Sequence, residues 1–178
     1  ATNAALESRL AGLAYCDTVL DVTWLTDANA IAGSAWDDGP STSDGLVSWH
    51  SALDWASNLT VNGIGGWNLP SMDADGDDVV VDCRDIPEAV CRDNPYGYMF
   101  YHNGVTGVSP GPFAPHLQAY GYWAETETVP YEDIIAWLFT FGEGIQHPLG
   151  KTFFRHAWAV RSGDIAIFEN GSLSQPLE

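Results

Sequence analysis

The stretch LAYCDTVLDVTWL, residues 13–25, decides the fold class. From Val19 to Trp24 the residues alternate between two sets, which is the two-residue period of a β-strand, and β-branched residues are frequent. Asp17 and Thr18, just before this run, supply a turn. The sequence therefore predicts a β-hairpin over residues 13–25.

A different period follows further along the chain. Between Ser48 and Leu59 the apolar residues fall on one face of a three-turn helix, and Ser48 is a suitable N-cap. The residues on this face are Trp49, Ala52, Leu53, Ala56 and Leu59. The glycine-rich run at residues 63–66 is expected to stop the helix.

The remaining segments are short strands and long loops. Glycine, proline and small polar residues predict loops at 33–45, 71–95 and 103–118. A short helix is expected at Tyr96–Tyr101, and strands are expected at 120–127, 136–141 and 153–161. We expect an α+β fold with short antiparallel strands, one main helix and long loops.

Composition narrows the classes of function. The chain has 178 residues, with 24 acidic and 6 basic side chains, and its net charge is −18. Hydrophobic residues make up 46%, which is too many for a disordered acidic chain. Phosphate and sulfate groups are bound by clustered Lys and Arg, so the charge argues against nucleic acid, anionic membranes and sulfated polyanions as partners.

The sequence also indicates where in or outside the cell the protein is expected. The longest apolar run, residues 134–139, is about a third of the length that a membrane-spanning helix requires, so no membrane insertion is expected. The chain begins at Ala1 without a charged and apolar leader. We interpret it as a mature secreted product, although a trimmed chain would look the same.

The acidic loop carries the clearest pattern of candidate ligands. Carboxylates at alternate positions from residue 73 would lie on one side of a tight loop, where hard oxygen ligands suit Ca²⁺. The predicted ligands are Asp73, Asp75, Asp77, the backbone carbonyl near Val79, and Asp82, with Asp85 as an alternative to Asp82. The match to an EF-hand loop is partial, because glycine is at position 4 and Arg84 is at position 12. The competing interpretation is a solvated acidic loop, but close aspartates repel one another unless a cation offsets them.

Three cysteines bear on redox state. Cys83 and Cys91 flank a short acidic loop, and this spacing suits a disulfide in an oxidising compartment, with two free thiols as the alternative. Cys16 is left over. It is a candidate either for a buried free thiol or for a disulfide between molecules.

Other candidate sites have structural alternatives. Most tryptophans are expected in the core, whereas Trp36, in a glycine-rich loop, is the best candidate for an exposed glycan contact. Glu125 and Glu127 lie at i and i+2 on a predicted strand, the arrangement of a glycosidase pair or of structural hydrogen-bonding groups. Asn58 and Asn170 fit the N-glycosylation pattern.

Five landmarks in order resemble one bacterial family. They are residues 15–25, Trp49–Ala52, Gly66–Pro70, Tyr122–Glu127 and Ala157–Arg161. Together they resemble the Lcl C-terminal domain family, named for the C-terminal domain of a secreted collagen-like adhesin. The resemblance covers residues 13–164, preceded by an extension at 1–12 and followed by another at 165–178.

The resemblance implies an extracellular, non-enzymatic domain related to C-type-lectin-like and formylglycine-generating-enzyme folds. It therefore favours structural roles for Glu125 and Glu127. Two positions depart from the family pattern: Asn68 stands where arginine is usual, and Cys16 where an aromatic residue is common. The family's named adhesin domain binds sulfated glycans, which the charge of −18 disfavours here.

These observations lead to two functional hypotheses. The first is a secreted structural or adhesive protein of the bacterial surface, stabilised by calcium, that associates with copies of itself into an oligomer or filament. Leu6 and Leu10 in the first extension, with Leu13 directly after it, and the apolar residues 165–168 in the second would support such contacts. The alternative is that both tails fold back on their own domain. The second hypothesis is a calcium-dependent glycan-binding module.

Overall fold

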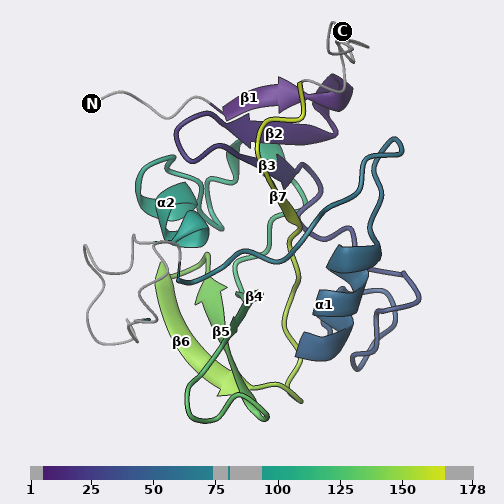
Figure 1. The fold of residues 1–178 in the computed structure, drawn as a ribbon, viewed down its shortest axis with the longest axis vertical. Coiled ribbons are helices and arrows are strands. Elements are labelled where there is room, and N and C mark those ends of the chain that lie inside the picture. The colour runs from purple at the N-terminus through teal and green to yellow at the C-terminus, as the bar shows by residue number, and fades with distance from the viewer. Residues whose placement is uncertain (1–5, 74–79, 81–93, 167–178) are drawn as a thin grey trace, which may run out of the picture.

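The computed structural model describes residues 6–73, 80 and 94–166. Two antiparallel sheets and two α-helices make an α+β fold, as predicted (Figure 1). The strands are β1 (Leu6–Arg9), β2 (Ala14–Asp17), β3 (Val22–Leu25), β4 (Gly121–Glu127), β5 (Ile135–Thr140), β6 (Ile145–Gly150) and β7 (Val160–Ser162). The helices are α1 (Trp49–Asn58), α2 (Pro95–Tyr101) and the 3₁₀ turns η1 (Leu10–Gly12) and η3 (Gly111–Phe113).

The first sheet has the order β1-β2-β3-β7 and contains the predicted hairpin. Its turn is longer than expected, because Val19 and Asp21 belong to the turn and β3 starts at Val22. Asp17 holds this turn by accepting hydrogen bonds from the backbone N–H groups of Val19 and Leu20 at 3.0 and 3.1 Å. Aspartate side chains commonly stabilise turns in this way.

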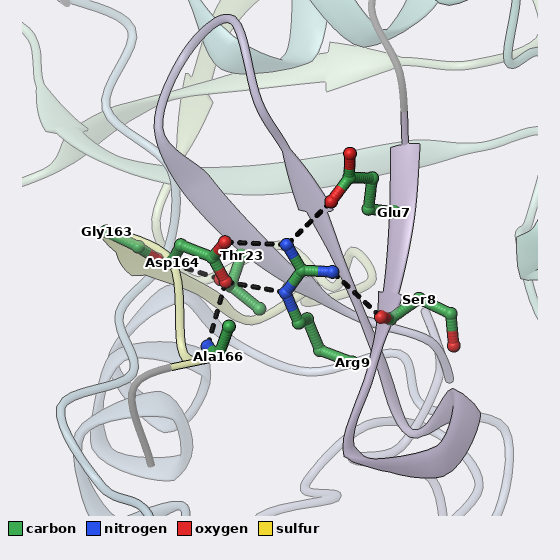
Figure 2. Close-up of polar contacts among 7 residues, drawn as sticks. All are labelled: Glu7, Ser8, Arg9, Thr23, Gly163, Asp164 and Ala166. Carbon is green, nitrogen blue, oxygen red and sulfur yellow. Dashed lines mark hydrogen bonds and ion pairs between the residues drawn. The ribbon is translucent and has the colours of Figure 1, made fainter. Parts of the chain in front are cut away.

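The first sheet also contains residues from both ends of the described chain. β1 pairs with β2, so residues 6–9 fold back on their own domain, as the alternative hypothesis for the tail held. At the other end Ile165 is fully buried. Figure 2 shows that Arg9 of β1 donates two hydrogen bonds to the Asp164 carboxylate, from Nε at 2.7 Å and from Nη2 at 2.6 Å.

The second sheet has the order β4-β5-β6. The sequence predicted β4 and β5 but missed β6, whose Pro148 and Gly150 are poor strand formers. The strand predicted at 153–161 was wrong over most of its length, since only its last two residues belong to β7. The rest of that segment bridges separate elements, with Arg155 paired to Val47 and His156 to Tyr122.

Helix α1 forms where the apolar period predicted it. Ser48 caps its N-terminus, and Asp38 accepts hydrogen bonds from both the backbone N–H and the hydroxyl of Ser48. The helix ends at Asn58, before the glycine-rich run that was expected to stop it. Trp55, which the predicted apolar face omitted, is buried with Trp49.

Tryptophans dominate the core, as predicted. The indole N–H groups of two of them join distant elements by finding backbone acceptors, which buried donors usually do. Trp49 of α1 donates to the carbonyl of Ala124 at 2.8 Å, and Trp123 of β4 donates to that of Val47 at 2.9 Å. The two bonds fix α1 and the segment before it against the second sheet.

An aromatic cluster centred on Tyr96 of α2 connects the two sheets. Its hydroxyl donates to the carbonyl of Trp123 at 3.0 Å, and its ring lies 5.7 Å from Trp24 and 5.9 Å from Phe139. Trp24 belongs to the first sheet and Phe139 to the second. Helix α2 therefore fills the space between the sheets and brings its first residues to the site described next.

Candidate functional site

A pocket of about 590 Å³ opens where the acidic loop leaves the folded domain and returns to it. The segment before the loop, the start of α2, β4 and the β3 and β7 strands surround it. The polar residues of its lining are Asn68, Ser71, Asp73, Asn94, Glu125 and Ser162. We call it the loop pocket.

Two pairs of contacts fix the ends of the loop at this pocket. Before the loop, the Thr126 hydroxyl accepts a hydrogen bond from the N–H of Met72 at 2.8 Å, and the Ser71 hydroxyl accepts one from the N–H of Asp73 at 3.1 Å. After the loop, Asn94 caps α2 by accepting from the N–H of Gly97, and its amide donates to Gln146 at 2.7 Å. The first predicted calcium ligand, Asp73, is thereby held beside β4.

Glu125 places a carboxylate in the same pocket. Its backbone N–H donates to the carbonyl of Pro70 at 2.9 Å, which fixes the strand position, while its side chain is exposed. Burial of part of this carboxyl raises the pKa of Glu125, and no Lys or Arg in the described chain forms an ion pair with it. A cation bound in the pocket would stabilise the ionised form of the Glu125 carboxyl and so lower its pKa again.

The other calcium ligands lie outside the described residues. These are Asp75, Asp77, Val79 and Asp82, and the predicted disulfide of Cys83 with Cys91 lies outside them as well. Among the residues that are described, no three His, Cys, Asp or Glu side chains gather into a metal site. The calcium site and the disulfide stay predictions; peptide mapping without reductant tests the second.

Glu127 does not share the pocket with Glu125. Its carboxylate forms an ion pair with the buried Lys151, with 2.9 Å between Oε2 and Nζ. The same ammonium group donates to the carbonyl of Glu132 and lies 4.0 Å from the centroid of the Trp49 ring. Glu127 is therefore engaged with its own structural partners, and the two carboxylates line different pockets.

The remaining candidate residues are dispersed. Trp36 is half-buried and packs against the core, and its glycan role stays a prediction. Asn58 is exposed at the end of α1, whereas Asn170 lies outside the described residues. Cys16 is a buried free thiol whose pKa burial raises to about 11, which favours the buried-thiol alternative over a disulfide between molecules.

A second feature, which the sequence did not reveal, is an exposed apolar patch at the loop between β4 and β5. Val129, Tyr131 and Ile134 in that loop have exposed fractions of 75%, 55% and 61%, and Phe153 in the adjacent segment has 56%. The N–H of Lys151 donates to the carbonyl of Ile134 at 2.9 Å, which places the two segments side by side. We call these four residues the β4–β5 patch. Apolar residues inside a loop-like sequence were its only signal.

Searches of protein families, of curated proteins and of solved structures found no match to this chain. Neither helix in the described part of the chain has the length and apolar character needed to cross a membrane.

Proposed function

We propose that this chain is a secreted, non-enzymatic structural or adhesive protein of the bacterial surface that associates with copies of itself and is stabilised by calcium. The β4–β5 patch is the observation that carries the proposal. Large apolar side chains gathered at one place on a highly charged protein are typical of a contact surface. Self-contact would remove Val129, Tyr131, Ile134 and Phe153 from water.

The first sheet offers a surface that suits the other side of the contact. In the described structure β1 lies at the edge of its sheet, and an edge strand has backbone groups available to pair with another chain. Figure 1 draws the longest axis vertically, with β1 near one end and the loop between β4 and β5 at the other.

The position of these two surfaces favours a particular geometry. A contact between opposite ends of neighbouring copies is heterologous, and it continues into a filament unless the rotation between copies closes a ring. Residues 6–9 are already part of the domain, so we assign their role in assembly to the strand edge and not to a free tail. Repulsion between copies of charge −18 opposes assembly, and salt or bound Ca²⁺ reduces it.

The proposal includes membership of a fold family. The ordered landmarks, the tryptophan-rich core and a long acidic loop held at both ends support kinship with the Lcl C-terminal domain family and with C-type-lectin-like folds. The ligands Asp73, Asp75, Asp77, Val79 and Asp82 would fix that loop around Ca²⁺.

Sedimentation velocity with calcium at physiological salt tests self-association. We expect species much larger than the 19.3 kDa monomer, and we expect the double variant Ile134→Ser, Phe153→Ser to shift them toward the monomer. Val108→Ser is the control, because Val108 is 95% exposed and lies outside the patch. A monomer at all concentrations, or equal assembly of the double variant and the wild type, would contradict the proposal.

The loop pocket favours a second candidate, a calcium-dependent glycan-binding module. Asn68 and Glu125 are both exposed, and both line the pocket that contains Asp73. An amide and a carboxylate beside a calcium ion can bind paired sugar hydroxyls that also complete the metal shell. Under this hypothesis glycan binding requires calcium and is lost in Glu125→Gln, while the β4–β5 variants bind normally; a glycan array with and without chelator measures it.

A further inference from the structure

A second pocket, of about 620 Å³, lies away from the acidic loop and is lined by described residues of β4, β5, β6 and the segment before β7. Its polar and aromatic lining consists of Tyr120, Thr140, Glu143, His147, Phe154 and Arg155. We call it the Arg155 pocket. None of the sites proposed above uses it.

Arg155 is held firmly by its backbone. Its N–H donates to the carbonyl of Val47 at 3.0 Å, and its carbonyl accepts from the N–H of Val47 at 2.8 Å. Its side chain lies over Gly121, where an added Cβ would sit 3.0 Å from the Arg155 Cδ. The glycine therefore leaves the room in which the arginine stem rests against β4.

Within the described part of the chain, the guanidinium group has no anionic partner. Nη1 donates to the carbonyl of Phe154 at 2.6 Å, and no carboxylate forms an ion pair with Arg155 in the described structure. A guanidinium group has five N–H donors, so most of its bonding capacity is unused. Burial lowers the pKa of Arg155.

The contrast with other cations of this acidic chain is informative. Arg9 is paired with Asp164 and Glu7, and Lys151 is paired with Glu127. Although acidic side chains outnumber basic ones fourfold in the sequence, 24 to 6, none of those in the described residues forms an ion pair with Arg155. A half-buried guanidinium group without an anion, in a pocket, is suited to an external carboxylate, which arginine binds through two parallel hydrogen bonds.

The other residues that line the pocket indicate which class of carboxylate ligand fits it. Tyr120, 72% exposed, offers an aromatic face of the kind on which the apolar face of a sugar ring stacks. Glu143 is exposed and also lines the pocket, so its carboxylate is available to accept hydrogen bonds from hydroxyl groups. Carboxylate, ring and hydroxyl groups occur together in acidic sugars.

We propose that the Arg155 pocket binds a monosaccharide residue that carries a carboxylate, such as a hexuronate, with the carboxylate on Arg155 and the ring against Tyr120. This binding needs neither calcium nor self-association. The net charge repels an anion at long range, but physiological salt screens that repulsion beyond roughly 8 Å, and Arg155 acts at contact distance.

The test is a titration of the monomeric protein in the presence of chelator, with binding measured by NMR chemical-shift changes. The ligands are glucuronate, glucose as a sugar without the carboxylate, acetate as a carboxylate without the sugar, and hippurate as an aromatic carboxylate. We expect glucuronate to bind best, and Arg155→Gln to weaken it about tenfold or more, the loss typical of a hydrogen-bonded charge pair. Arg161→Gln makes the same change of charge outside the pocket and is expected to bind as the wild type does.

A second variant keeps the test independent of folding defects. Tyr120→Ala alters an exposed side chain and is expected to weaken the binding of glucuronate but not that of acetate. Val108→Ala is the control, because Val108 is exposed and lies outside both this pocket and the β4–β5 patch. Equal binding of glucose and glucuronate, or no effect of Arg155→Gln, would overturn the carboxylate assignment. If acetate bound as tightly as glucuronate, or hippurate bound more tightly than glucuronate, the sugar assignment would be overturned.

Discussion

His156 shows how one buried residue couples stability to pH. The side-chain NH₂ of Asn29 donates to the carbonyl of Asp44, so the side-chain oxygen of Asn29 is the atom that lies 3.1 Å from His156 Nδ1. Because that oxygen can only accept a hydrogen bond, Nδ1 carries the proton. Gly45, in the same turn, has a φ of +74°, and a Cβ there would sit 2.1 Å from the Asn29 oxygen. A small residue in a left-handed conformation thus makes room for the contact.

Burial lowers the pKa of His156 to about 4, below its ordinary value of 6.5. The unfolded chain therefore binds a proton that the folded chain rejects, so stability is full above pH 6.5 and falls as the pH drops toward 4. We expect a loss of about 2 kcal/mol between pH 7 and pH 5, measured by urea unfolding. His156→Gln should lack most of this dependence; an equally steep dependence in that variant would contradict the assignment.

The ion pair of Arg9 with Asp164 makes stability depend on pH in a more acidic range. The hydrogen bonds from Arg9 hold the pKa of Asp164 at about 2, so the stability that this carboxylate contributes is present above pH 4 and is lost between pH 4 and pH 2. Because the Asp164 side chain is 33% exposed, solvent screening leaves about 1 kcal/mol for the pair. A double-mutant cycle with Arg9→Gln and Asp164→Asn at pH 7 measures it. Glu7→Gln, at a more exposed partner, is expected to change stability by less.

At the scale of elements, α1 depends on a carboxylate outside the helix. Asp38 accepts from the Ser48 N–H at 2.8 Å and from the hydroxyls of Ser48 and Ser51 at 2.7 and 2.9 Å. Burial alone would raise the pKa of Asp38, but these hydrogen bonds outweigh it and hold the pKa below its usual value. The negative charge also suits the N-terminal end of a helix.

We expect Asp38→Ala to lower the free energy of unfolding by about 1–2 kcal/mol, as the loss of a helix cap does. Asp54→Ala is the control, since Asp54 is exposed within α1 and plays no part in the cap. Chemical denaturation followed by tryptophan fluorescence compares them. Equal stabilities of the two variants would show that the Asp38 hydrogen bonds contribute nothing net.

Elements with a clear period were predictable, and those that depend on partners were not. The apolar residues of α1 and the alternation around Trp24 contain their own structural signal. β1 is a short, mostly polar edge strand, and β6 contains Pro148, so neither has a strand signature. The segment at 153–161 alternates like a strand, but before Val160 its neighbours allow only isolated bridges.

The candidate sites divide in the same way. Acidic residues at alternate positions were visible as a calcium pattern because all of them lie within ten residues. The loop pocket was not visible, since Asn68, Asp73 and Glu125 meet only after α2 and β4 have formed. Likewise, the lack of an ion pair at Arg155 among the described residues depends on where their carboxylates lie in the fold.

For the molecule as a whole, calcium is expected to raise thermal stability. A ligand that binds only the folded chain stabilises it by about 2.7 kcal/mol at one hundred times its dissociation constant. Melting curves with calcium and with chelator measure this, and Asp73→Asn should reduce the difference. Asp133→Asn is the control, because it removes an equal charge from the loop between β4 and β5 and is expected to leave the difference unchanged. A melting temperature that is the same in calcium and in chelator would contradict the calcium site.

The order of strands in the first sheet has a consequence for synthesis of the protein. The Thr23 hydroxyl donates to the carbonyl of Gly163, 140 positions later, and β3 pairs with β7 in the same region. A nascent chain halted at residue 159 has β1, β2 and β3 but lacks the strand that completes them, so we expect proteases to cleave it readily and to spare the chain extended through residue 166. Pairings this distant also fold slowly. The ribosome must therefore release most of the polypeptide before the first sheet can be completed, and the chain stays open until β7 has emerged.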